Sequence, residues 1–183
     1  MTGKSGQYAG EIKGPFRAPE GVLVHANGTV YVAGAWSGNV VAFKAGKVVG
    51  ELKGLSSPHD LVATGSGDIW LADAGNDRMV MITPALEIKL VLKGAPYNFS
   101  GPRYLDLLSD ETLVVADKYS HSIKLVSIKP VYRGHEVLTV VGTGKPGKGA
   151  GVFRTPEGVA VHNRNLWFAD SGNNRIVRYR LGR

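Results

Sequence analysis

The sequence predicts an all-β fold, a β-propeller of four four-stranded blades. Four segments of the 183-residue chain align with one another, and they begin at Ala18, Ser57, Gly101 and Thr155. Each holds three short apolar runs separated by turns, and a more polar fourth run follows each of the first three segments. No helical periodicity interrupts the pattern. Short strands at regular spacing, repeated as a unit, are typical of one antiparallel sheet per repeat.

The elements of each unit come in a fixed order. A proline opens the first strand, at Pro19, Pro58, Pro102 and Pro156. The second strand carries a large apolar residue at the same place in each unit, namely Tyr31, Trp70, Val114 and Trp167. A six-residue turn leads to the third strand, and "KVVGELKG", "EIKLVLKG" and "HEVLTVVGTG" supply the outer strands. We expect nearly continuous apolar strands because neighbouring blades bury both faces of each sheet.

The two ends of the chain raise the question of closure. Residues 7–14 resemble an outer strand without a blade, whereas the last unit stops after its third strand. We therefore predict that residues 7–14 complete the C-terminal blade of a single domain, with repeats at about 16–54, 55–94, 95–144 and 145–183. The alternatives are an open arc whose free strand edges associate with another chain, or a part of a larger propeller.

The glycine-rich segment 140–153 contains a G-x-G-x-x-G pattern at Gly142, Gly144 and Gly147. A phosphate loop of the Walker type needs Ser or Thr after its lysine, but Gly149 follows Lys148. A dinucleotide loop must open a helix, and the following residues hold Gly and Pro instead. We interpret the segment as the connection from the third blade to the fourth.

The turn between the second and third strands is the most closely repeated feature. "DAGNDR" (Asp73–Arg78) and "DSGNNR" (Asp170–Arg175) are close copies, and "DKYSHS" (Asp117–Ser122) is a looser one. The aspartate is expected to accept backbone N–H groups across its own turn, and the final arginine to return to the carboxylate. The first unit, "GAWSGN" (Gly34–Asn39), lacks both charges. We assign these residues a structural role.

Candidate ligand-binding residues follow from the start of the inner strands, because propellers present ligands at the mouth of the central channel. Two carboxylates and an imidazole there could hold a divalent cation, whereas an arginine would oppose it. The predicted mouth residues are the one after each proline and two that follow: Glu20, His59, Arg103, Glu157, Asp60 and Tyr104.

The proline openings, the "IWLAD"-type strands and the "D-x-G-N-x-R" turns resemble NHL-repeat propellers from about Phe16 onward. The resemblance implies a propeller that usually has six blades, in a family that includes enzymes, RNA binders and protein-interaction modules. The segment from Ser57 is also similar to one blade of the peptidyl-hydroxyglycine amidating lyases. This second resemblance implies that His59 is a zinc ligand and Asp60 its companion, but the lyases need three such histidines, and Glu20, Arg103 and Glu157 stand at the equivalent places.

Composition and charge bound the function further. There is no cysteine, so disulfides and thiolate metal sites are excluded. We expect a soluble protein without a signal peptide or membrane span, and its compartment stays open. Residues 1–116 hold 10 Lys/Arg against 11 Asp/Glu, whereas residues 117–183 hold 12 against 4. This basic third could meet an anionic partner through Lys118, Lys124, Arg133, Lys145, Lys148, Arg154, Arg175, Arg178 and Arg180.

Three functions are consistent with these observations. No G-x-S-x-G or H-E-x-x-H motif occurs, and no complete catalytic set is present. We therefore predict a non-catalytic binding or scaffold propeller for a protein or anionic partner, without a cofactor. The alternatives are a metal-dependent lyase or hydrolase at the channel mouth, with His59 as a ligand, and an RNA-binding module in which Tyr119 or Tyr132 stacks on bases.

Overall fold

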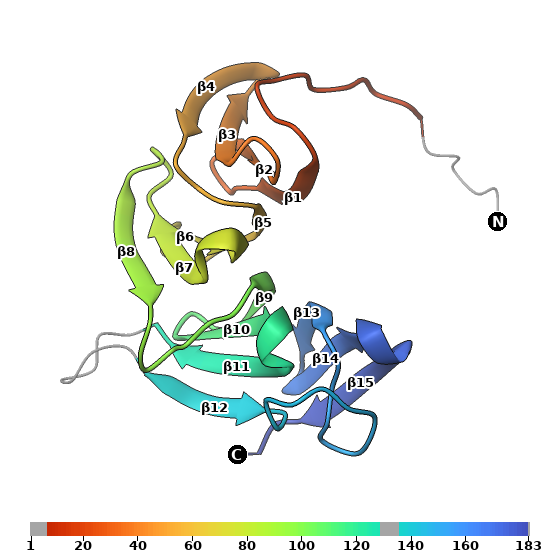
Figure 1. The fold of residues 1–183 in the computed structure, drawn as a ribbon. Coiled ribbons are helices and arrows are strands. Elements are labelled where there is room, and N and C mark those ends of the chain that lie inside the picture. Colours follow the sequence, from red (N-terminus) through yellow and green to blue (C-terminus); the bar gives the residue numbers. More distant parts are fainter. Residues whose placement is uncertain (1–6, 129–135, 183) are drawn as a thin grey trace.

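The computed structural model describes residues 7–128 and 136–182. Within them the chain is all-β apart from three single-turn 3₁₀ helices, and its sheets follow one another around an arc (Figure 1). The all-β propeller fold is confirmed. Within the described ranges, no helix is long and apolar enough to cross a membrane.

Three of the sheets have four antiparallel strands in sequence order. The first sheet comprises β1 (Pro19–Val24), β2 (Val30–Gly34), β3 (Asn39–Lys44) and β4 (Lys47–Leu52). The second comprises β5 (Pro58–Ala63), β6 (Ile69–Asp73), β7 (Arg78–Ile82) and β8 (Ile88–Lys93). The third comprises β9 (Pro102–Ser109), β10 (Thr112–Asp117), β11 (Ser122–Ser127) and β12 (Val137–Val141).

The fourth sheet has three strands, and this corrects the prediction for the N-terminus. It comprises β13 (Pro156–His162), β14 (Asn165–Asp170) and β15 (Arg175–Arg180). Residues 7–14 form no strand, and Figure 1 shows that the N-terminal segment extends away from the sheets. The segment does not pair with β15, and the arc stays open between the first and fourth sheets (Figure 1). β15 therefore keeps a free edge among the described residues.

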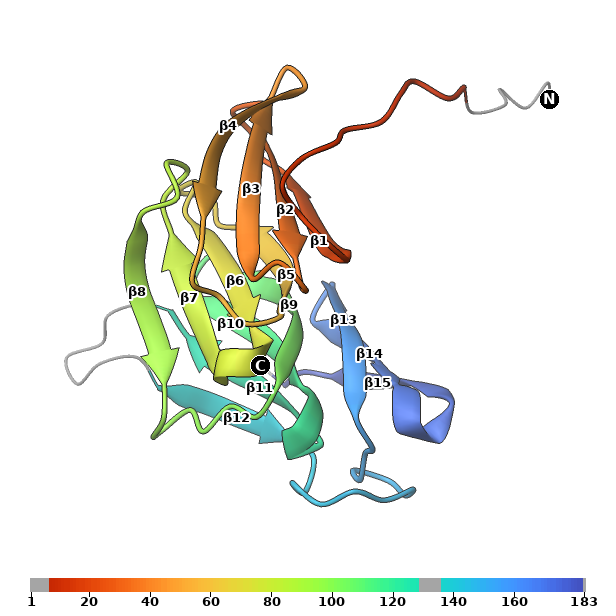
Figure 2. The same ribbon diagram turned by 45° about the horizontal axis from the view of Figure 1, so that its top comes forward.

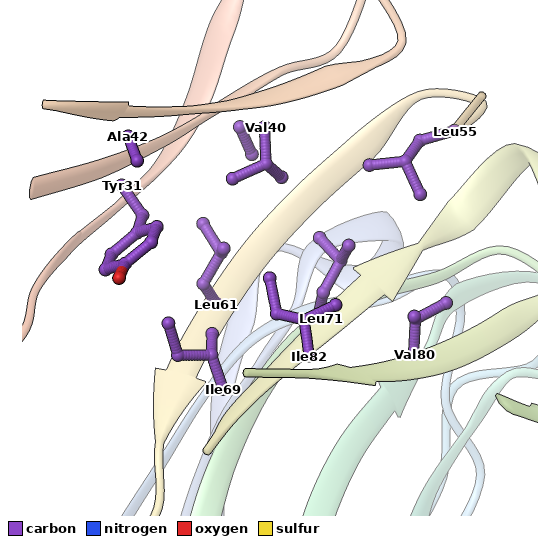
Figure 3. Packing of buried hydrophobic residues seen from close by; sticks show 10 residues of the cluster. Tyr31, Val40, Ala42, Leu55, Leu61, Ile69, Leu71, Val80 and Ile82 are labelled. Carbon is purple, nitrogen blue, oxygen red and sulfur yellow. The ribbon is translucent and has the colours of Figure 1, made fainter. Parts of the chain in front are cut away.

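The inner strands hold the arc together, with β1 packed on β5, β5 on β9 and β9 on β13 (Figures 1 and 2). Apolar side chains fill the space between successive sheets. Figure 3 shows the cluster between the first two sheets, in which Tyr31 and Val40 face Leu61, Ile69 and Ile82. Such burial contributes about 25 cal/mol per Å² of apolar surface, so sheet-to-sheet packing dominates the stability.

The prolines that open the inner strands lie beside the ends of the second strands. Pro19 pairs with Gly34, Pro58 with Asp73, Pro102 with Asp117 and Pro156 with Asp170. The start of each inner strand and the following turn therefore share one face of the arc. In three of the sheets this turn is a 3₁₀ helix: η1 (Ala74–Asn76), η2 (Lys118–Ser120) and η3 (Ser171–Asn173). We call this side the mouth face.

The repeated aspartates stabilise these turns, but their backbone donors differ from those that the sequence predicted. Asp73 accepts the side-chain N–H of Arg78 and of Asn76, as expected for the returning arginine. Its backbone donor, however, is Ser56, two residues before the proline, at 2.7 Å. Asp117 and Asp170 accept the backbone N–H of Ser100 and Arg154 at the same relative position, also at 2.7 Å. The carboxylate thus joins the turn to the connection that enters the inner strand.

The first sheet replaces this carboxylate by a hydroxyl. Ser37 Oγ accepts the backbone N–H of Arg17, which stands two residues before Pro19, and donates to the carbonyl of Gly34. The glycine-rich connection leads from β12 to β13, as predicted, and Arg175 and Asn173 bind its carbonyl groups at Gly147, Gly149 and Val152.

Candidate functional site at the channel mouth

The predicted mouth residues lie together. His59 Nε2 is 2.6 Å from a terminal nitrogen of Arg103, and the rings of His59 and Tyr104 meet edge to face with centroids 6.3 Å apart. Burial raises the pKa of Tyr104, and the negative charges of Glu20, Glu157 and Asp60 raise it further. All six side chains, one or two from each sheet, therefore act on one another. We call them the mouth cluster.

Most side chains of the mouth cluster already form hydrogen bonds or ion pairs with other groups of the chain. His59 is 2% exposed, and its Nδ1 donates to the carbonyl of Ser57 at 2.8 Å. Its Nε2 must then be the acceptor for Arg103, so the imidazole is neutral and both nitrogens are engaged. Glu157 is paired with Lys118 at 2.5 Å. Within the part of the chain that the structure describes, no three His, Asp or Glu side chains gather as a metal site would require.

Asp60 has a structural task between two sheets. Its carboxylate accepts the backbone N–H of Leu61 at 2.9 Å and of Leu105, on the next inner strand, at 3.2 Å. Burial raises the pKa of Asp60, and these two hydrogen bonds oppose the rise without cancelling it. Asp170 shows the opposite balance, because the donors at Arg154, Asn173 and Arg175 outweigh desolvation and hold its pKa below the ordinary value.

Carbon-detected NMR of the aspartate carboxyls should therefore give a midpoint above 3.8 for Asp60 and below 3.8 for Asp170. The raised folded-state pKa of Asp60 makes folding more favourable as the pH falls through that pKa towards 3.8. The lowered pKa of Asp170 contributes stability above 3.8 that is lost as the pH falls through the folded-state value. Equal midpoints, or the reverse order, would contradict these hydrogen-bond assignments.

Two exposed aromatic residues lie on turns of the mouth face, and the sequence analysis did not single them out as a pair. Trp36 is 79% exposed and Tyr119 is 55% exposed. They occupy the same position of the turn in the first and third sheets, where the second and fourth sheets have Gly75 and Gly172. Lys118 Nζ lies 5.7 Å from the centroid of the Tyr119 ring. The sequence could have revealed this pair, because both residues are aromatic at a turn position that holds glycine in the other two repeats.

The predicted basic surface is smaller than expected. The prediction that Lys124 belongs to this surface is wrong. Its side chain is 8% exposed, pairs with Asp117 at 2.6 Å and donates to the carbonyls of Tyr97 and Asn98. Lys118 and Arg175 are bound to Glu157 and Asp170. Arg133 and Tyr132 lie outside the described residues. The exposed members are Lys145, Lys148 and Arg154 on the β12–β13 connection and Arg178 and Arg180 on β15.

A groove of about 440 Å³ lies between the second and third sheets, at the strand ends away from the mouth face. Its floor includes Trp70 and Met81, and its rim holds Asp68, which is paired with Lys89 at 2.6 Å. The indole N–H of Trp70 has no hydrogen-bond partner within the described residues. None of the mouth residues lines this groove.

Comparison with known proteins supports the fold. No family model matches the sequence, and no curated protein does. Solved structures match over most of this chain. They include virginiamycin B lyase from Staphylococcus aureus, with 21% identity and a TM-score of 0.67 over 92% of this chain and 57% of the lyase. The propeller domain of Swd1 from Myceliophteria thermophila matches with 12% identity and a TM-score of 0.66 over 90% of this chain and 54% of that chain.

Hydrazine synthase from Kuenenia stuttgartiensis is similar over 90% of this chain and 45% of its own, with 16% identity and a TM-score of 0.66. The chain thus spans little more than half the length of the lyase that it resembles. At these identities the likeness concerns the fold, which both enzymes and a propeller domain share. The chain has the β-propeller fold.

Proposed function

We propose that this chain is a non-catalytic binding module that presents its mouth face to a protein partner. The observation that carries the proposal is the contrast between the mouth cluster and the two aromatic residues on turns of the mouth face. Trp36 and Tyr119 are exposed, whereas His59, Asp60 and Glu157 are already engaged by groups of the chain. Exposed tryptophan and tyrosine side chains are the residues that most often dominate the energy of protein interfaces.

The geometry gives this surface a rigid frame. The turns that carry Trp36 and Tyr119 are fixed to the entering connections by Ser37 and Asp117, through the hydrogen bonds described above. Binding through a fixed turn costs little conformational entropy because the side chains alone are ordered. Glu20 adds an exposed carboxylate to this surface. A partner segment with an apolar or aromatic residue and one basic group would match this chemistry.

A phage-displayed library of random 12-residue peptides, selected on the wild-type chain, tests the proposal. The affinity of the enriched peptides should fall about 30-fold or more in Trp36→Ala, the loss expected of a residue that anchors an interface. Tyr8→Ala is the matched control, because Tyr8 is 80% exposed on the N-terminal segment. Peptides that bind Trp36→Ala and the wild type equally would overturn the proposal.

The RNA alternative predicts that the chain binds a nucleic acid rather than a peptide. Its support is the set of exposed cations on the β12–β13 connection, and its probe is a single-stranded oligouridylate. Binding of that probe should weaken steeply with salt and should be lost in Lys145→Glu/Lys148→Glu, because phosphate contacts release counterions. If only the oligouridylate binds, the protein-partner proposal fails in favour of RNA.

A further inference from the structure

The two ends of the arc expose apolar sheet faces that the interior of the arc would bury. Each sheet has a forward face, which packs on the next sheet, and a backward face, which packs on the preceding one. The forward face of the fourth sheet and the backward face of the first have no neighbouring sheet (Figure 1). We compare each with the equivalent positions in the other repeats.

The forward face of the fourth sheet keeps the residues of a packed interface. Tyr31, Trp70 and Val114 occupy one repeat position and are each 0% exposed, whereas Trp167 at the same position is 40% exposed. A second position repeats this contrast at the centre of the face. Its members Val40, Met79 and Ile123 are 0% exposed, and Ile176 is 69% exposed.

The backward face of the first sheet is open along its inner strand and covered further out. Val22 is 67% exposed, whereas Leu61 and Leu105 at the same position are each 5% exposed against the preceding sheet. On β2 and β3 of the same face, Val32, Val41 and Phe43 are 7%, 0% and 1% exposed and pack with Phe16. The residue three before each proline also belongs to this contact. Leu55, Phe99 and Phe153 are buried there, and Phe16 is only partly buried against Phe43.

A groove of about 400 Å³ lies on this backward face. Val22, Val30, Val32 and Glu20 of the first sheet line it together with Ile12 and Phe16 of the preceding segment. The forward face of the fourth sheet carries cations instead, with Arg178 5.3 Å from the ring of Trp167 and Arg180 on the same strand. Neither arginine is paired with a carboxylate in the described part of the chain. The two faces thus carry opposite charges, one carboxylate on the first sheet and two guanidinium groups on the fourth.

A glycine marks the place where inner strands approach one another. A side chain at Gly21 would collide with the backbone of His59 and Asp60 on β5. Gly158 stands at the equivalent position of the fourth sheet, and nothing lies within 4 Å of where its side chain would be. The fourth sheet therefore has the same clearance for a following inner strand, without one being present among the described residues.

The surface area agrees with two uncovered faces. The chain exposes 10221 Å², whereas a compact monomer of 19.5 kDa is expected to expose about 8,500 Å². The extended N-terminal segment and the two faces both contribute to this excess.

We propose that a second copy of this chain closes the ring. The fourth sheet of each copy packs forward on the first sheet of the other, which gives eight sheets around one axis. Propellers of four to eight blades are known, so eight is within the range of the fold. Two such contacts related by a twofold axis leave no face open, and one chain carries both halves of the contact. A second copy therefore fits both faces.

Native mass spectrometry and light scattering test the proposal. The wild type should have twice the chain's mass of 19.5 kDa. Trp167→Glu and Val22→Glu should each raise the dissociation constant of the dimer by about 30-fold or more. Both residues are exposed in the single chain, so both variants should keep the wild-type circular dichroism. Trp36→Glu is the matched control and should stay dimeric, because Trp36 lies on the mouth face.

The two substitutions also distinguish the arrangement. A contact between two fourth sheets would be insensitive to Val22→Glu, and a contact between two first sheets would be insensitive to Trp167→Glu. Dimers that survive either substitution would overturn the proposal. A monomeric wild type, as expected if further blades of a longer chain cover these faces, would overturn it too, and so would an open-ended series of larger masses.

Discussion

Replacing Lys124 by methionine is expected to lower the free energy of unfolding by about 3–5 kcal/mol, the loss typical of a broken buried ion pair. Lys124 and Asp117 are 8% and 0% exposed, and their charged atoms are 2.6 Å apart. Methionine fills much of the same volume, so the loss reflects the carboxylate that is left without its cation. Chemical denaturation at pH 7 measures it.

The pH dependence and a second substitution identify the cause. Burial raises the pKa of Asp117 even with its partner present, and removal of Lys124 removes an interaction that opposes the rise. A raised folded-state pKa means that the folded protein gains stability as the pH falls through that pKa towards the ordinary value. The deficit of Lys124→Met should therefore shrink on acidification.

Adding Asp117→Asn to Lys124→Met should restore more than half of the loss at pH 7, because the amide oxygen can still accept from Ser100 N without carrying a charge. The carbonyls of Tyr97 and Asn98 lose the Lys124 donor in both variants, so full recovery is not expected. A single variant that loses less than about 1 kcal/mol, the scale of an exposed pair, would contradict this account.

Replacing Asp73 by alanine is expected to cost about 3 kcal/mol, because one buried carboxylate serves three donors. Ser56 N–H, Asn76 Nδ2 and Arg78 Nε all meet it at 2.5–2.9 Å. Its loss frees the turn from the connection that enters β5 and leaves the Ser56 N–H without its acceptor. Arg78 is 22% exposed and can turn to water, which limits the cost.

Glu11→Ala is the control for the second substitution. Glu11 pairs with Lys13 at 2.7 Å, but the two side chains are 63% and 82% exposed. Such a pair contributes at most about 1 kcal/mol, so the unfolding midpoint should stay close to that of the wild type. Equal losses in the two variants would show that the Asp73 hydrogen bonds add nothing beyond surface charge.

The repeats explain why the fold could be predicted from the sequence. Prolines, strand residues such as Trp70 and Trp167, and the aspartate turns recur in register, so the four sheets and the convergence of the mouth cluster followed from alignment alone. The returning arginines were also predictable, because Arg78 and Arg175 stand at equal positions after their aspartates.

Other features depend on distances that alignment does not give. The prediction that residues 7–14 complete the fourth sheet was wrong, since it required the arc to close within one chain. Lys124 was predicted to contribute to a basic surface. The third repeat has Ser122 where the second and fourth have Arg78 and Arg175, and Lys124, two residues later, replaces that cation. The Asp73 backbone donor at Ser56 comes from the preceding connection, which lies 17 residues away.

The state of the His59 ring tests the central claim most directly, since a binding module keeps this ring in its structural hydrogen bonds and a metal enzyme would use it. Long-range ¹H–¹⁵N correlation spectra of the wild type should show the neutral ring protonated on Nδ1, with Nε2 as an acceptor. One equivalent of Zn²⁺ should leave both nitrogen shifts unchanged, because Arg103 occupies Nε2. A Zn²⁺-induced shift of Nε2 that is lost in His59→Ala would contradict the claim and favour metal-dependent chemistry at the mouth.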